Sequence, residues 1–93
     1  MQDPLVLGID LGTSGVRIAV IDSSCALLQS ESAPYKIGLI NPFDWRDRCC
    51  TLIGRLKPDY RHRLKAIAVD GTSGTLLACD QQGLPLAEAL PYS

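Results

Sequence analysis

The chain carries one short phrase of acid, glycine and hydroxyl residues twice. The first copy is Asp10-Leu11-Gly12-Thr13-Ser14-Gly15, and the second is Asp70-Gly71-Thr72-Ser73-Gly74. Each copy follows an apolar run and leads into a second apolar run, which closes on Asp22 in one case and on Asp80 in the other. A glycine-rich turn presents backbone N–H groups to an anion because no side chain blocks the approach. The pattern therefore favours phosphate and polyol chemistry.

The first copy has the residue types for a phosphate group with its metal ion. Gly12, Thr13 and Ser14 are the candidate phosphate-binding residues, because the turn supplies amides and the hydroxyls add donors. Asp10 cannot bind phosphate directly, since both are anionic, but its carboxylate can hold Mg²⁺ or its water ligands beside the phosphate. There is no Gly-Lys-Ser/Thr, and a strand rather than a helix is expected to follow. These two features exclude a Walker loop and a dinucleotide fingerprint.

The second copy lacks the residue between acid and glycine, so its turn must differ in shape. Asp70, Thr72, Ser73 and Thr75 offer short polar side chains at one sheet edge. A polyhydroxylated ligand needs such a mixture of donors and acceptors. The plainer interpretation of each copy is a hairpin turn whose acid and hydroxyls satisfy local amides. Two copies at adjoining strand ends favour a binding role.

An aspartic protease of the short, single-domain kind is an alternative, since those enzymes also place an acid, a hydroxyl residue and glycine after apolar residues. Their order is Asp-Thr-Gly. Here the hydroxyl residue comes later, as in Asp10-Leu11-Gly12-Thr13 and Asp70-Gly71-Thr72. The spacing disfavours this class.

The bulk properties exclude several other classes. The chain has 93 residues, a net charge of -1 and 20% charged residues, so no bulk attraction to nucleic acid or to an anionic membrane is expected. No apolar run approaches the roughly 20 residues that span a bilayer, and the start has no basic segment of a signal peptide. We expect a cytoplasmic protein. The four cysteines form no Cys-x-x-Cys pair and are expected to be small buried or half-buried hydrophobes: Cys25, Cys49, Cys50 and Cys79.

Apolar runs predict strands over residues 5–10, 15–22, 25–33, 65–70 and 75–80. A helix is predicted from Pro42, with Asn41 as its N-cap and Asp44 in its first turn, and Lys57-Pro58 is expected to end it. One apolar stripe lies at helical spacing: Trp45, Cys49, Leu52, Ile53 and Leu56. The basic stretch 61–65 is expected to be a solvated connection.

The resulting order is β-β-β-α-β-β, an α/β fold. Short links predict an antiparallel meander for the first three strands, and strand 75–80 is expected to be the hairpin partner of strand 65–70. The helix makes a crossover, so strand 65–70 should lie parallel to strand 5–10 in a mixed sheet. Both aspartate-glycine turns would then open at the same carboxyl edge, where ligands bind in open α/β sheets.

Three segments resemble known sequences. Residues 7–17 look like the first phosphate motif of the actin-like ATPase superfamily, which has a ribonuclease H-like fold. Residues 67–86 resemble the equivalent stretch of the FGGY carbohydrate kinases, including its closing Asp-x-x-Gly-x-Pro turn. Asn41-Pro42-Phe43-Asp44-Trp45 resembles the Asp-Pro-x-Asp-Trp helix start of that family. The resemblance covers essentially the whole chain, and it is nearest to ribulose and xylulose kinases.

The resemblance implies ATP- and Mg²⁺-dependent phosphorylation of a sugar hydroxyl, with a pentulose as the expected substrate. Asp10 matches the magnesium-organising acid, and Arg17 matches a recurrent arginine of the phosphate motif, although a salt bridge within the sheet is its plainer role. The second copy matches the sugar-pocket segment, and the residues expected to bind sugar are Asp70, Thr72, Ser73 and Gly74. One departure is Gly38-Leu39-Ile40, which stands where the family often has Gly-Trp-x-Glu-Gln.

Residues 1–93 are accordingly expected to form the N-terminal part of the first FGGY domain. The resemblance implies that the catalytic base and the adenosine site lie in downstream residues, so neither Asp10 nor Asp70 is expected to be the base, and the chain alone is expected to be inactive. No nucleic-acid or membrane partner is expected, and a homodimer of the full-length protein stays open. The alternative function is a nucleotide-binding switch protein of the same superfamily without sugar kinase activity.

Overall fold

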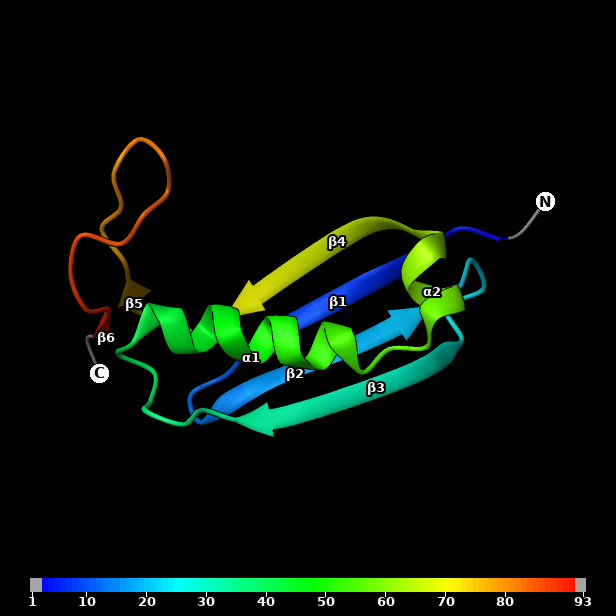
Figure 1. Cartoon of the computed structure of the whole chain (residues 1–93), viewed down its shortest axis with the longest axis horizontal. Helices are drawn as coiled ribbons and strands as arrows, with labels where there is room; N and C mark the ends of the chain where they lie inside the picture. The colour runs from blue at the N-terminus through cyan, green and yellow to red at the C-terminus, as the bar shows by residue number, and fades with distance from the viewer. Residues whose placement is uncertain (1–2, 92–93) are drawn as a thin grey trace.

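The computed structural model describes residues 3–91 (Figure 1). Three long strands are followed by two helices, a fourth long strand and two short strands. The bounds are β1 Leu5–Leu11, β2 Gly15–Ile21, β3 Leu27–Pro34, α1 Pro42–Gly54, α2 Pro58–Arg63, β4 Leu64–Gly71, β5 Thr75–Leu76 and β6 Leu90–Pro91.

The long strands form one mixed sheet in the order β3-β2-β1-β4, and β5 and β6 pair separately. β1, β2 and β3 are successive antiparallel neighbours, as the short links predict. β4 returns through the helices and lies parallel to β1, with Leu7 opposite Ile67 and Asp10 opposite Asp70. The predicted mixed sheet and crossover are therefore confirmed.

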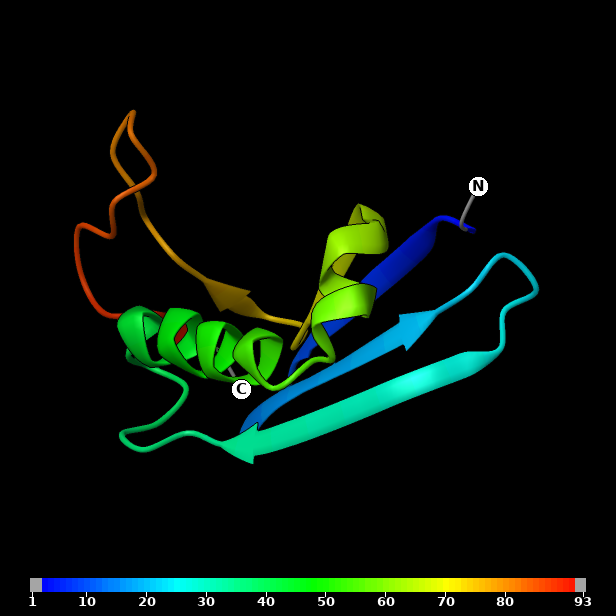
Figure 2. The same cartoon turned by 45° about the vertical axis from the view of Figure 1, so that its right-hand side comes forward.

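Helix α1 covers one face of the sheet, and the core lies between them (Figures 1 and 2). Strand side chains alternate between faces, so every second residue of β1 and β2 points toward α1. The fully buried core consists of Leu5, Leu7, Val16, Ile18, Val20, Leu52 and Leu56, with Ala33 at its border. The opposite face, which carries Gly8, Asp10 and Arg17, has no helix over it in residues 3–91.

Helix α1 begins as predicted. The Asn41 side chain accepts hydrogen bonds from the amides of Phe43 and Asp44, and Pro42 occupies the first turn. The helix ends at Gly54, earlier than the predicted Lys57-Pro58 end, and Leu56 reaches the core from beyond the helix. The basic stretch 61–65 is largely solvated, as expected, but part of it is helical rather than a plain connection. Pro58 starts the short helix α2, where Arg63 pairs with Asp59 at 3.1 Å.

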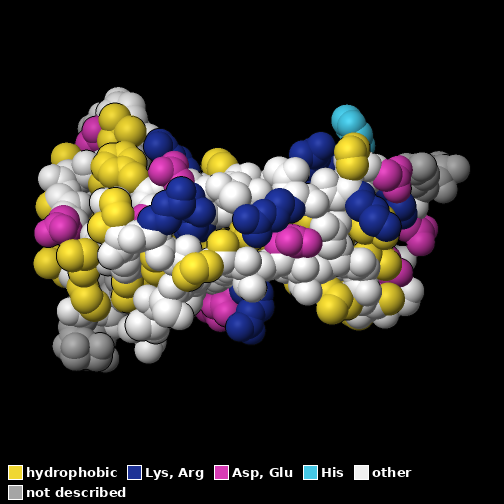
Figure 3. Space-filling model, turned by 60° about the horizontal axis from the view of Figure 1, so that its bottom comes forward, with side chains coloured by type: hydrophobic (Ala, Val, Ile, Leu, Met, Phe, Trp, Pro, Cys, Tyr) yellow, Lys and Arg dark blue, Asp and Glu magenta, His cyan; other side chains and the backbone are white. Residues whose placement is uncertain are grey.

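The predicted hairpin between strands 65–70 and 75–80 was also wrong. Only Thr75 and Leu76 form a strand, and β5 pairs with β6 rather than with β4. The amide of Thr72 donates to the carbonyl of Leu11 and so continues the hydrogen bonding between the β1 and β4 segments past Gly71. Apolar side chains remain exposed at the end of the molecule that holds β5 and β6 (Figure 3), among them Leu76, Leu84, Leu86 and Leu90.

The cysteines only partly follow the prediction. All four are free thiols, and Cys49 is half-buried against the core, where burial raises its pKa. Cys25, Cys50 and Cys79 are exposed. Within the described part of the chain, neither helix has the length and apolar character that crossing a membrane would require.

Candidate functional site

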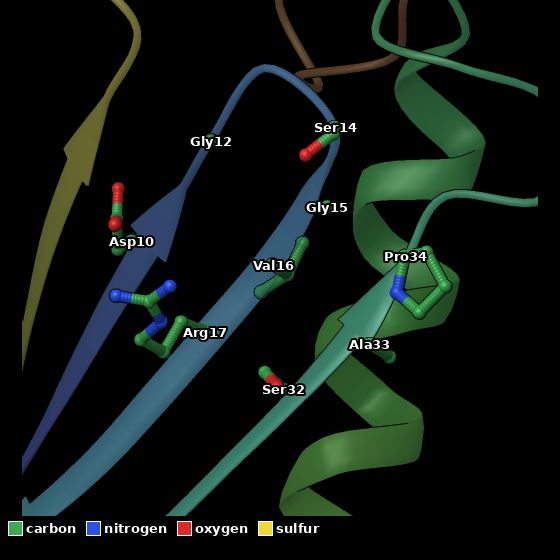
Figure 4. Close-up of a pocket in the computed structure, with 9 residues that line it drawn as sticks. All are labelled: Asp10, Gly12, Ser14, Gly15, Val16, Arg17, Ser32, Ala33 and Pro34. Atoms are coloured by element: carbon green, nitrogen blue, oxygen red, sulfur yellow. The ribbon is translucent and has the colours of Figure 1, made fainter.

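The two aspartates of the repeated phrase meet in one row across the sheet. Asp10 is opposite Arg17 on β2 and opposite Asp70 on β4, and Arg17 is opposite Ser32 on β3. Cross-strand partners point to the same face, so this row lies on the face away from α1. Figure 4 shows the Arg17 guanidinium directed toward β1, beside Asp10. The parallel pairing of β1 with β4 thus brings the two copies together.

The first turn is tightly held. The amide of Gly12 donates to the Gly15 carbonyl at 2.9 Å and closes the hairpin. A Cβ on Gly15 would lie 2.4 Å from the Ala33 carbonyl oxygen, so only glycine fits where the end of β3 pairs with the start of β2. The Tyr35 amide donates to the Ser14 carbonyl at 3.0 Å, and the Tyr35 hydroxyl donates to the Gly12 carbonyl at 2.9 Å.

These contacts engage the Gly12 amide and the carbonyl groups of Gly12, Ser14 and Gly15, and they leave the amides at the tip of the turn free. Within residues 3–91, no hydrogen bond engages the amides of Thr13 and Ser14, and both residues are exposed. A groove of about 280 Å³ lies beside the turn (Figure 4), and Gly12, Ser14 and Arg17 contribute to its lining. Free amides, hydroxyls and one guanidinium suit a phosphate group.

The donor set beside this groove fits a magnesium ion that also binds phosphate. Asp10 is exposed, and no hydrogen bond or ion pair in the described residues engages its carboxylate. Asp70 is its neighbour in the row and accepts a hydrogen bond from the Gly71 amide at 3.0 Å. The described residues contain no cluster of three or more candidate metal ligands. Mg²⁺ commonly binds through one or two carboxylates with waters and substrate phosphates, so a complete protein cage is not required.

The second turn forms a different, smaller hollow. Leu11, Leu39 and Trp45 line a cavity of about 100 Å³ together with Gly71, Thr72 and Thr75. The Thr72 and Thr75 hydroxyl oxygens lie 2.7 Å apart, within hydrogen-bond distance. Hydroxyls on one side and apolar walls on the other can bind both the alcohols and the C–H groups of a polyol.

The second-copy candidates do not all lie at this cavity. Asp70 lines a groove of about 340 Å³ on the open face of the sheet, together with Asp10 and Arg17. Ser73 and Gly74 are absent from the lining of the 100 Å³ cavity, and Gly74 takes a positive φ of 76° in the turn. The register thus brings Asp70 to the row of the first copy, whereas Thr72 lies beside the helix.

Sequence reasoning missed two residues that hold the site. Tyr35 clamps the first turn, and burial is the main cause that raises the pKa of its hydroxyl. Trp45, which the sequence analysis places on the apolar stripe and in the family-like helix start but not at a ligand site, also lines the small cavity. The sequence around Tyr35 gives no signal for this contact, because its hydroxyl bonds to a carbonyl 23 residues earlier in the chain.

Comparisons with known proteins point to one group. A curated xylulose kinase from Staphylococcus xylosus is 29% identical over 96 residues, which cover 95% of this chain and 20% of that protein. The chain thus spans about a fifth of the length of that relative. No family model matches the chain.

Solved structures agree on the fold. A xylulose kinase from Brucella ovis matches with a TM-score of 0.80 and 22% identity, over 92% of this chain and 20% of that one. The glycerol kinase of Plasmodium falciparum, solved with ADP, matches with a TM-score of 0.73 and 15% identity, over 95% of this chain and 20% of that one. These structures confirm the mixed α/β fold predicted from the sequence.

Proposed function

We propose that the full-length protein phosphorylates a sugar hydroxyl with ATP, since this chain is homologous to the N-terminal portion of the FGGY-family sugar kinases. The observation that carries the proposal is the row across the sheet. It brings the acid of a phosphate-type turn and the acid of a hydroxyl-rich turn to the same register of two parallel strands. Phosphoryl transfer requires the phosphate donor and the polyol acceptor to lie side by side, and this row supports such an arrangement.

In this proposal the first copy binds the nucleotide phosphates. The free amides and hydroxyls of Thr13 and Ser14 donate to phosphate oxygens, and Arg17 adds positive charge. Gly12 lines the groove without a side chain, so the phosphate can approach the turn closely. Asp10 holds Mg²⁺ through its carboxylate. The bound ion neutralises charge on the phosphates during transfer.

The second copy supplies part of the sugar pocket. Thr72, Ser73 and Gly74 are proposed to contact the sugar, and the cavity beside Thr72 and Thr75 supports a polyol as the ligand. Asp70 is proposed as an acceptor for a sugar hydroxyl from its place beside Asp10. Catalysis of this kind depends mainly on positioning and electrostatics, so aligning the hydroxyl in line with the γ-phosphate is the task of these residues. The base that accepts the proton is proposed to come from residues outside this chain.

A substrate panel tests the proposal. We expect ATP-dependent ADP release from the full-length protein with D-ribulose or D-xylulose, and smaller or no release with hexuloses. Asp10→Asn should abolish the activity, whereas Asp47→Asn, on the exposed side of α1, should not change it. Isothermal titration with the same sugars separates binding from turnover. Tight ATP binding without heat from any sugar would instead support a nucleotide switch.

The 93-residue chain by itself is proposed to be inactive, because the catalytic base and the adenosine site are expected elsewhere. Incubating the purified chain with ATP, Mg²⁺ and each pentulose should give no ADP above the blank. Turnover by this chain alone would contradict the proposed division of the active site.

A further inference from the structure

One turn of helix α1 holds the segment that precedes it. Asp44 is 4% exposed, and its Oδ2 atom accepts hydrogen bonds from the amides of Ile37 at 2.6 Å and Gly38 at 3.0 Å. Gly38 has a φ of 142°, a conformation that side-chain-bearing residues rarely adopt. The carboxylate and the glycine together fix one conformation of the backbone before the helix.

The charge of Asp44 is stabilised where it lies. Burial acts to raise the pKa of Asp44, but hydrogen bonds from the backbone of Ile37, Gly38 and Lys36 and the nearby Arg48 outweigh it, so the pKa lies below its ordinary value. The Arg48 Nε atom lies 3.6 Å from Asp44 Oδ1, and both side chains are largely buried. A buried carboxylate that accepts two amides is a strong anchor, because hydrogen bonds to an ionised acceptor are stronger than those to a neutral one.

The next residue continues the anchoring toward the small cavity. The Trp45 indole Nε1–H donates to the Leu39 carbonyl at 2.7 Å. Leu39 and Trp45 then form the wall that faces Thr72 and Thr75 across the cavity. Asp44 fixes the segment at positions 37 and 38, and Trp45 fixes it at position 39, so the position of this wall depends on both.

We propose that Asp44 is a positioning residue for sugar binding, acting through the 37–39 segment on the wall formed by Leu39 and Trp45. This inference rests on the proposed function, because it takes the cavity beside Thr72 and Thr75 as part of the sugar pocket. Asp44 itself touches neither substrate. The first turn has hydrogen bonds of its own, from the Tyr35 amide and hydroxyl, so we expect the larger effect of Asp44 on the sugar side.

The test is a comparison of Michaelis constants in the full-length enzyme. Asp44→Ala should raise KM for the sugar about tenfold, because a small displacement of a binding wall weakens the alignment of the bound group. KM for ATP should stay within about twofold. Asp47→Ala is the matched control, since Asp47 lies on the same helix and is exposed. It should change neither constant.

A second variant keeps the test decisive if Asp44→Ala does not fold. Trp45→Phe removes the indole donor to Leu39 and retains an aromatic wall, so it should raise KM for the sugar in the same direction by a smaller factor. Equal rises in both KM values, or unchanged KM values in a folded variant, would overturn the inference. Absence of sugar phosphorylation by the wild-type enzyme would instead contradict the proposed function.

Discussion

The two copies of the acid-glycine-hydroxyl phrase have similar sequences and different surroundings. The first forms a closed hairpin, β1–β2, whose inward side chains are buried beneath α1. The second copy lies at the end of β4, which is an edge strand of the sheet. The strand that follows it, β5, pairs with β6 and not with β4. Leu7 and Ile67 are opposite one another in the ladder, yet Leu7 is 0% exposed and Ile67 is 60% exposed.

The turns that begin at Asp22 and Asp80, after the apolar run that follows each copy, have by contrast the same conformation. In both, the amide of the aspartate donates to the carbonyl of the residue four positions later, and its Oδ1 atom accepts from the amides two and four positions later. The residue three positions after the aspartate has positive φ, 64° at Cys25 and 82° at Gly83. Local sequence therefore determines the turn, whereas the partner available to each strand determines the topology.

The largest effect should come from the paired positions Leu7 and Ile67. Leu7→Ala should lower the free energy of unfolding by about 3 kcal/mol, because it leaves a cavity in a closed core. Ile67→Ala should lower it by only about 0.5 kcal/mol, because most of its side chain already contacts water. Urea denaturation of the chain at neutral pH measures both. Equal losses would show that the second copy is as well packed as the first.

A second pair compares the turn glycines. Gly15→Ala should lower the free energy of unfolding by about 2 kcal/mol, because the added Cβ meets backbone atoms of Ala33 and Pro34 that cannot rotate away. Gly71→Ala places its Cβ in open space and should change stability by less than about 0.5 kcal/mol. The same denaturation experiment applies. A neutral Gly15→Ala variant would mean that β3 does not pack tightly against the first turn.

The sequence predicted the meander, the parallel crossover and the start of α1, because each rests on local signals: strand-length apolar runs, short links and the Asn41-Pro42 cap. It failed where long-range contacts decide. Nothing near Thr75 indicates that the amide of Thr72 bonds to Leu11, or that β5 pairs with β6 instead of β4. The shared row of Asp10 and Asp70 follows from the predicted parallel pairing, but the Tyr35 clamp required the folded structure.

Substitutions at the positive-φ residues of these two turns, Cys25 and Gly83, should have opposite effects on stability. Cys25→Gly should raise the free energy of unfolding by about 0.5 kcal/mol, since relief of the strained φ exceeds the entropy that glycine loses on folding. Gly83→Ala should lower it by about 1 kcal/mol, because it introduces that strain. Thermal and urea denaturation measure both. A destabilised Cys25→Gly variant would show that the Cys25 side chain stabilises its turn by contacts that outweigh the strain.

The smallest effect concerns pH at the turn that closes the first hairpin. The hydrogen bond from the Ala26 amide is the main cause that holds the pKa of Asp22 below its ordinary value of 3.8, and burial opposes it more weakly. The carboxylate therefore stabilises the fold above about pH 4, and this contribution is lost as pH falls through the lowered pKa. The pKa of Asp44 is also lowered, so its carboxylate likewise loses its stabilising contribution as the pH falls. The urea midpoint should fall from pH 5 to pH 2.5, and Asp22→Asn should fall less steeply because asparagine retains the acceptor without the charge. Ser23→Ala, which leaves the carboxylate in place, should follow the wild-type slope; if Asp22→Asn does so too, the charge of Asp22 does not stabilise the turn.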